Sequence, residues 1–163
     1  MSDVIANFQV PPVEKSVLVP CAPTRAFQAF TAEIGQWWPI KTHSVGQAKA
    51  RSIILETRLG GRVFEIGADG SECEWGRILE WAPPHRFAMT WHPGRAAMAH
   101  QVLELSFEAE AQVGTESRAT RVTLVHRGWE MLGAEAKAKR DDYAGGWEAI
   151  LSRDFVPYCA RVA

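Results

Sequence analysis

Apolar and polar residues alternate along much of the middle of the chain, which is typical of β-strands with one buried face. In 101–108, for example, Leu103, Leu105 and Phe107 fall on one side. The segment 13–19 is rich in β-branched residues and predicts a further strand. Short turns join the later segments, so neighbouring strands must pair antiparallel, because parallel pairing needs long crossovers. The predicted strands are 13–19, 51–58, 62–66, 72–81, 86–91, 101–108 and 118–126.

The end of the chain has a helical period instead. Its apolar residues recur every three to four positions and form one stripe, which consists of Tyr143, Trp147, Ile150, Leu151, Phe155 and Tyr158. We expect a long C-terminal helix over about 134–161, and two short helices after the first strand, the first opening at Pro23. One face of the sheet must cover the long helix. The pattern thus predicts a single α+β domain over 1–163, with a curved antiparallel sheet of about seven strands around that helix.

Composition narrows the choice of partner and compartment. The net charge of the 163 residues is -1, so nucleic acid is not an expected partner, because phosphate binding needs a surplus of Lys and Arg. Cys21, Cys73 and Cys159 are widely spaced, as free thiols of a reducing compartment are. The sequence has neither a secretion signal nor an apolar run of the ~20 residues that a membrane span needs. We therefore expect a cytoplasmic protein without a membrane partner.

No residue pattern indicates a metal or a cofactor. The five histidines, none of which has the spacing of a metal-ligand pair, are His43, His85, His92, His100 and His126. Nucleophile elbows and glycine-rich phosphate loops are absent from the sequence as well. We predict neither a bound metal nor a cofactor, and no catalytic residue is assigned.

Tryptophan is the most informative residue type, with seven copies in the chain. Its ring is large, and its N–H needs a partner when buried. We expect most of these side chains to pack the core, and some to line a cavity between sheet and helix. Trp147 is the strongest candidate, because it follows Gly145-Gly146 on the helix stripe. Two glycines there would let the helix bend or let a ligand approach its backbone.

Three polar side chains are candidates to orient a ligand in such a cavity. Arg77 alternates with Trp75 and Leu79, His126 ends an apolar strand face, and Tyr143 begins the helix stripe. Together they could bind a carboxylate or polarise a carbonyl. Arg77 could instead face solvent, or follow a β-bulge that resets the phase, and His126 could be exposed at the strand end. The predicted ligand-binding residues are Trp38, Trp75, Arg77, Met89, Trp91, His126, Tyr143 and Trp147.

Five short motifs, in this order along the chain, resemble those of one family. They are Leu59–Glu65, Asp69-Gly70 with Trp75–Leu79, Pro83–Phe87 with Thr90-Trp91, His126–Glu130 and Gly146–Leu151. Over about Val13 to Cys159 the chain resembles the START-like (SRPBCC) superfamily, and more closely the homologues of the heat shock protein 90 ATPase activator. The resemblance implies the helix-grip fold, with a cavity between the sheet and the C-terminal helix. It does not choose among the activities that this fold supports.

Three functions fit these observations. The first is non-catalytic binding of a small hydrophobic molecule, supported by the aromatic residues and the lack of a catalytic motif. The second is a polyketide-cyclase-like enzyme that uses Arg77, His126 or Tyr143. The third is a co-chaperone or stress-response interaction module; the co-chaperone members carry an additional N-terminal domain without a counterpart here, which argues against a chaperone partner. A homodimer through an open sheet edge is also expected.

Overall fold

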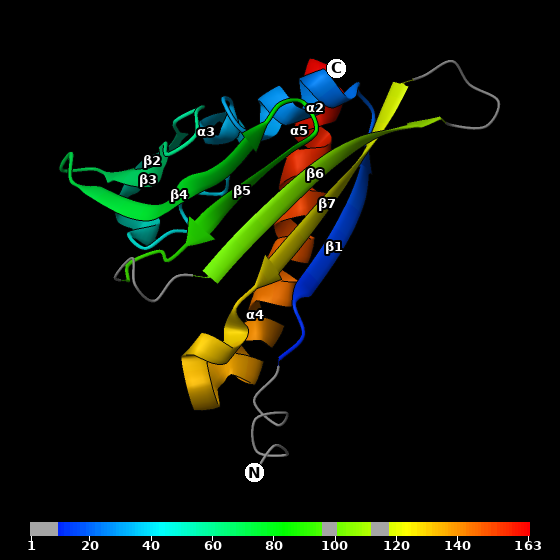
Figure 1. Ribbon diagram of the computed structural model, residues 1–163. Helices are drawn as coiled ribbons and strands as arrows, with labels where there is room; N and C mark the ends of the chain where they lie inside the picture. Colours follow the sequence, from blue (N-terminus) through cyan, green and yellow to red (C-terminus); the bar gives the residue numbers. More distant parts are fainter. Residues whose placement is uncertain (1–9, 96–100, 112–117) are drawn as a thin grey trace, which may run out of the picture.

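Seven antiparallel strands form one sheet in the order β1-β7-β6-β5-β4-β3-β2. The structure is a computed structural model that describes residues 10–95, 101–111 and 118–163. Its strands are β1 (Val13–Val19), β2 (Ala50–Leu55), β3 (Arg62–Gly67), β4 (Glu72–Ala82), β5 (Arg86–Trp91), β6 (Gln101–Ala111) and β7 (Arg118–Arg127). The sheet curls around the long C-terminal helix, which Figure 1 shows in orange to red against one face. The predicted helix-grip fold is confirmed.

The helical segments also follow the prediction. Two short helices come after β1, namely α2 (Pro23–Phe30) and α3 (Ile34–Trp37), and a 3₁₀ turn, η1 (Gln47–Lys49), precedes β2. The C-terminal region contains η3 (Trp129–Glu135), α4 (Ala136–Ala149), the π-helical turn η4 (Ile150–Phe155) and α5 (Val156–Val162). The helix begins at Ala136 because Gly133, with a φ of 60°, interrupts the preceding turn.

The irregular part of the long helix is its π-helical turn. Gly145 and Gly146 lie within α4, and the wider turn follows at Ile150–Phe155. Pro157, just after it, has no N–H to donate to a carbonyl one turn earlier, and a π turn accommodates that missing hydrogen bond. The irregular turn of the helix thus lies after the glycine pair and not at it.

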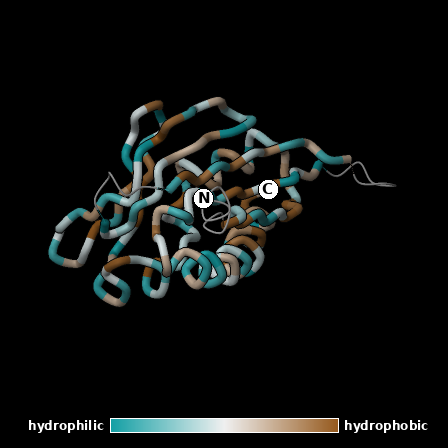
Figure 2. Tube along the Cα trace, turned by 60° about the horizontal axis from the view of Figure 1, so that its bottom comes forward, coloured by the Kyte–Doolittle hydropathy of each residue, from teal (hydrophilic) through white to brown (hydrophobic). Residues whose placement is uncertain are grey.

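The core lies between the helix and the concave face of the sheet. Leu103, Leu105 and Phe107 of β6 are buried, as their alternation predicts, and so are Leu151 and Phe155 of the helix stripe. Along the turns of the long helix in Figure 2, hydrophobic positions are interleaved with hydrophilic ones. This is the pattern of a helix with one packed side and one solvated side.

Ion pairs cover the opposite, convex face of the sheet. Arg62 contacts Glu72 at 3.0 Å, and Arg86 contacts Glu80 at 2.9 Å. Exposed pairs of this kind contribute little to stability, but they identify the solvated side of the sheet. No helix in the described ranges is long and apolar enough to cross a membrane.

Strand β4 departs from regular alternation at two β-bulges. Its register against β3 shifts so that Glu74 and Gly76 face consecutive residues of β3, which leaves Trp75 without a partner. A second shift against β5 occurs between Ile78 and Glu80. A bulge inserts one residue and reverses the facing of those that follow. The side of the sheet on which a β4 side chain lies therefore cannot be read from its parity.

Candidate ligand-binding site

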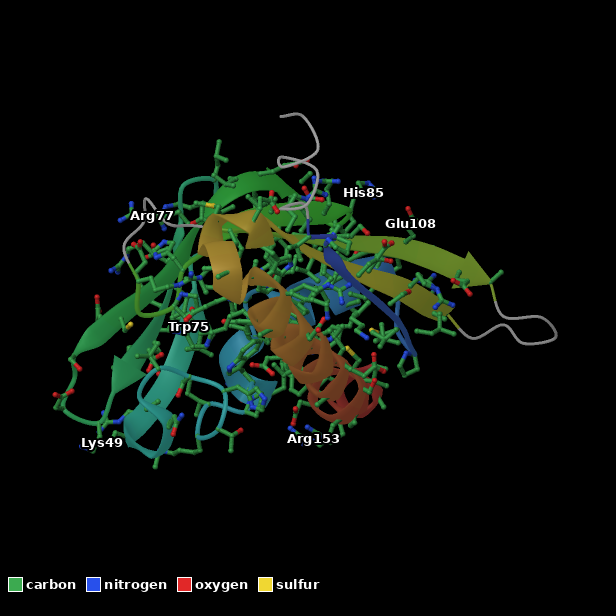
Figure 3. All side chains as sticks on the ribbon, turned by 90° about the horizontal axis from the view of Figure 1, so that it is seen from below. Lys49, Trp75, Arg77, His85, Glu108 and Arg153 are labelled. Atoms are coloured by element: carbon green, nitrogen blue, oxygen red, sulfur yellow. The ribbon has the colours of Figure 1, made fainter. Side chains whose placement is uncertain are left out.

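A pocket of about 380 Å³ lies between the long helix, the sheet and the loop after α3. Five of its lining residues are aromatic, and all five belong to the predicted set: Trp38, Trp75, Trp91, Tyr143 and Trp147. Trp75 and Trp91 come from β4 and β5, and Tyr143 and Trp147 from α4. In Figure 3, Trp75 lies between the sheet and the long helix. The structure thus brings residues from distant parts of the chain into one wall.

The four indole rings contact one another in a closed circuit. The distances between ring centroids are 5.4 Å for Trp38 and Trp75, 5.6 Å for Trp75 and Trp91, 5.2 Å for Trp91 and Trp147, and 5.8 Å for Trp147 and Trp38. Their tilted and edge-to-face orientations are those that aromatic quadrupoles favour. The four side chains are between 1% and 7% exposed. They therefore form a rigid floor of the pocket and belong to the core at the same time.

Each of the four indole N–H groups donates a hydrogen bond within the protein. The acceptors are the carbonyl oxygen of His43 for Trp38 (2.7 Å), Oε1 of Glu65 for Trp75 (2.7 Å), Oη of Tyr143 for Trp91 (3.2 Å) and Nδ1 of His126 for Trp147 (3.0 Å). These bonds fix the orientation of every ring. The indoles consequently offer a ligand ring carbons but no free donor.

His126 lies behind the pocket wall and not in the cavity. Its side chain is completely buried, and Nδ1 accepts the hydrogen bond from Trp147. The ring hydrogen must then be on Nε2, which donates to Oε1 of Gln101 at 2.7 Å. Burial lowers the pKa of His126 to about 3, and the positive charge of Arg95 contributes. The prediction of His126 as a ligand contact is therefore wrong; it is a neutral residue that positions Trp147.

The low pKa of His126 predicts that stability falls in mild acid. Its folded-state pKa of about 3 lies below the ordinary value of 6.5, so only the unfolded chain takes up this proton between those values. The stabilisation is complete above pH 6.5 and is lost as the pH falls toward 3. We expect the free energy of unfolding to drop by about 2 kcal/mol from pH 6.5 to pH 4.5 through the titration of this one group.

Urea denaturation across that pH range measures the effect. His126→Gln is the matched variant, because it keeps a neutral polar side chain at the position but cannot take up the proton. It should show a lower stability at pH 7 and a flatter dependence on pH. If the free energy of unfolding fell equally steeply with pH in the parent protein and in the variant, the proton would be taken up by another group.

Arg77 and Met89 do not line the pocket. The side chain of Arg77 is 56% exposed, and its Nε donates to Glu74 at 2.8 Å; Figure 3 shows it at the outer edge of the molecule. The bulge at Trp75 and Gly76 is the physical reason, since it reverses the facing of the residues after Trp75. The prediction that Arg77 points into the cavity is wrong. Met89 is buried in the core, where it borders a void of only about 10 Å³.

Glu65 supports the site, although it is not among the predicted ligand-binding residues. Its carboxylate is buried and accepts three hydrogen bonds, from the backbone N–H of Val45 (2.7 Å), the backbone N–H of Gly46 (2.9 Å) and the indole of Trp75 (2.7 Å). A buried carboxylate needs such donors to compensate for its lost hydration. One side chain thus fixes both the floor of the pocket and the loop at its wall. The available signal was an acidic residue in an otherwise buried strand.

The rim of the pocket is more polar than its floor. It includes Thr42, His43, Ser44, Asp142 and Gly146. The Oγ1 atom of Thr42 lies 2.8 Å from Nδ1 of His43. Asp142 could have been found from the sequence, because it lies four residues before Gly146 and one before Tyr143 on the same helix, and residues four apart share a face. The structure describes no group of three His, Cys, Asp or Glu side chains that could hold a metal ion. His100 lies outside the described residues, so the absence of metal stays a prediction.

Comparison with known proteins agrees with the fold and the motifs. A search of curated proteins found no match. Among solved structures, the anthrahydroquino-gamma-pyrone synthase Txn09, in complex with a ligand designated SUM, is 29% identical, has a TM-score of 0.57, and matches over 92% of this chain and 97% of its own. Protein SSP2350 of Staphylococcus saprophyticus is 17% identical with a TM-score of 0.61, over 90% of each chain.

A further similar structure is protein CV1439 of Chromobacterium violaceum, 14% identical, with a TM-score of 0.60, over 91% of this chain and 96% of its own. The two low-identity structures show the fold alone. The model of one protein family, described as "Activator of Hsp90 ATPase homolog 1-like protein", matches residues 20–158. With that match over most of its length, this chain belongs to the family of Activator of Hsp90 ATPase homolog 1-like proteins.

Proposed function

We propose that this protein binds a small, predominantly apolar molecule in the pocket between the long helix and the sheet. The observation that carries the proposal is the aromatic wall of four tryptophans and Tyr143 around about 380 Å³ of space. That volume is at the lower end of the ~300–1,000 Å³ typical of small-molecule sites. Rings held by hydrogen bonds also need no rearrangement on binding, which favours affinity.

A bound ligand should stabilise the fold, because the same rings form the pocket floor and the core. A ligand that binds only the folded state at 100 times its Kd adds about 2.7 kcal/mol to the free energy of unfolding. A thermal-shift screen of small aromatic molecules is therefore a suitable first search. Planar two-ring compounds match the flat indole surfaces best.

An enzyme of the polyketide-cyclase type is the second candidate. The observation that favours it is the 29% identity to the anthrahydroquino-gamma-pyrone synthase Txn09. Tyr143, His43 and Asp142 are the titratable groups at the pocket that could donate or accept a proton. Mass spectrometry of a bound compound before and after incubation separates the two functions, since a binder returns it unchanged.

The chaperone-related function and the homodimer stay predictions. A homodimer would pair the free edges of the sheet, which are β1 and β2. A co-chaperone would need an interaction surface outside the pocket. Neither idea conflicts with ligand binding, because the pocket lies on the concave side.

Two adjacent glycines provide a test of the site. A Cβ atom at Gly145 or at Gly146 would meet nothing within 4 Å, so both positions accept a side chain. Gly146 lines the pocket and Gly145 is exposed. We expect Gly146→Leu to reduce the affinity for 1-naphthylmethanol more than about tenfold by filling the cavity, a loss in the range of hydrophobic-pocket discrimination. Gly145→Leu should change it less than about twofold, and calorimetric titration measures both.

The control separates blocked binding from altered stability. Both variants replace a glycine of the same helix with leucine, and each should raise helix propensity by about 1 kcal/mol. Equal affinity of the parent protein and Gly146→Leu for a bound probe would place its site elsewhere. Equal losses in both variants would indicate an indirect effect on the helix.

A further inference from the structure

The pocket is poor in hydrogen-bond donors. All four indole N–H groups are engaged within the protein. The hydroxyl of Ser44 donates to the carbonyl oxygen of Ile40 at 2.6 Å. The hydroxyl of Tyr143 accepts the hydrogen bond from Trp91 and keeps its own proton, so the side-chain donors that remain are this hydroxyl and the ring of His43, which contacts Thr42 at 2.8 Å. A carboxylate or phosphate ligand, which needs several donors to replace its hydration, would be poorly compensated in this pocket.

The rim of the pocket carries a negative charge, which disfavours an anionic ligand and favours a cationic one. Among the lining residues that the structure describes, Asp142 carries the one fixed charge, and neither Lys nor Arg is present. Its neighbour Asp141 forms ion pairs with Lys137 (3.0 Å) and Arg140 (3.3 Å), whereas no ion pair between described residues includes Asp142. This carboxylate is therefore available to a cation in the pocket.

The aromatic floor favours a cation as well. The face of an indole ring attracts positive charge more strongly than those of the other aromatic side chains. At the edge of the Trp75 ring, the indole N–H donates to the carboxyl group of Glu65 at 2.7 Å. His126, behind Trp147, stays neutral because burial, and then the positive charge of Arg95, lower its pKa; Arg95 itself is not among the residues that line the pocket.

We propose that the ligand of this pocket is a hydrophobic amine, with its ammonium group beside Asp142 and its apolar part on the indole floor. This inference rests on the proposed function and adds the class of ligand to it. A cationic ligand also takes the place of the carboxylate ligand that was predicted from Arg77 in the cavity.

The test compares three probes that share one ring system: 1-naphthylmethylamine as the cation, 1-naphthylmethanol as the neutral compound and 1-naphthoic acid as the anion. Calorimetric titration at pH 7.5 and low salt measures each affinity. We expect the amine to bind about tenfold more tightly than the alcohol, from the contact with Asp142 and the indole faces together. The acid should bind more weakly than the alcohol.

Two charge-neutralising variants assign the preference to one residue. Asp142→Asn should weaken amine binding about fivefold and leave alcohol binding within about twofold. Asp141→Asn removes the same charge from the adjacent position, which is not at the pocket, and should leave both affinities within about twofold. If both variants weakened amine binding equally, the preference for the amine would come from long-range attraction. That result would overturn the role of Asp142.

The outcomes distinguish this inference from the proposed function. If 1-naphthylmethanol binds the parent protein but not Gly146→Leu, the pocket is supported as the ligand site, whichever charge the site prefers. An acid that binds as tightly as the amine, or an amine no tighter than the alcohol, overturns the amine proposal while the pocket stands. If none of the three probes binds at millimolar concentration, both proposals fail.

Discussion

Trp147→Ala should lower the free energy of unfolding by about 3–5 kcal/mol, the usual cost of deleting a buried aromatic side chain. The indole is 1% exposed and packs against Trp38 and Trp91 at centroid distances of 5.8 and 5.2 Å. Its loss also leaves Nδ1 of His126 without its donor in a buried position, which adds to the cost. Urea denaturation, read from a shift in midpoint at constant slope, measures the change.

Trp147→Phe is the matched control. It keeps a ring in the core but cannot donate to His126, so we expect an intermediate loss of about 1–3 kcal/mol. A loss below about 1 kcal/mol for Trp147→Ala would contradict the packing described for this residue. The expected loss also explains why Trp147→Ala is a poor test of binding. Trp147 serves the core and the site together, whereas a side chain added at Gly146 enters open space at the pocket.

Gly76→Ala should destabilise the protein by at least about 3 kcal/mol, at or beyond the upper end of ordinary overpacking. A Cβ atom at this position would lie 1.7 Å from the carbonyl oxygen of Thr90, on the neighbouring strand. Backbone atoms cannot turn aside as a flexible side chain can, so β4 and β5 would have to separate next to the bulge that presents Trp75. The same denaturation experiment, with soluble yield as a second measure, detects this effect.

Gly145→Ala provides the comparison for Gly76→Ala. Gly145 lies in an exposed helix position where a Cβ atom meets nothing within 4 Å. Alanine there should raise stability by about 0.5–1 kcal/mol through helix propensity. The two substitutions add the same methyl group, so opposite signs would isolate the close approach at β4. A Gly76→Ala variant as stable as the parent protein would show that the strands at the bulge are further apart than described.

The fold could be predicted because hydrophobic burial has a clear period in this sequence. The alternation in 86–91 predicts β5 with both bounds as found, and the stripe through Trp147 and Phe155 predicts the helix that the sheet covers. The ends of the strands were predicted less accurately. The predicted strand 51–58 ends at Leu55, because the chain turns just after it, where the backbone N–H of Arg58 donates to the carbonyl oxygen of Glu56.

The sequence predicted the aromatic residues that line the pocket, Tyr143 included, but not the positions of Arg77 and His126. The strand and helix periods show which aromatic residues lie on buried faces. These faces meet where the helix packs against the sheet. The position of Arg77 depends on a bulge, and a bulge leaves no mark in the alternation. The roles of His126 and Glu65 depend on donors from segments 21 and about 20 residues away in the chain. Such contacts follow from the assembled fold, not from local sequence.

A crystal structure of the protein with the tightest-binding naphthyl probe tests the ligand site most directly. We expect the ring system to lie against Trp38, Trp91 and Trp147, next to Gly146, with these indoles in the orientations described. A second cavity is lined by Lys49 and Cys73, among others. A probe bound in that cavity, or on the convex face of the sheet, would contradict a ligand site between helix and sheet.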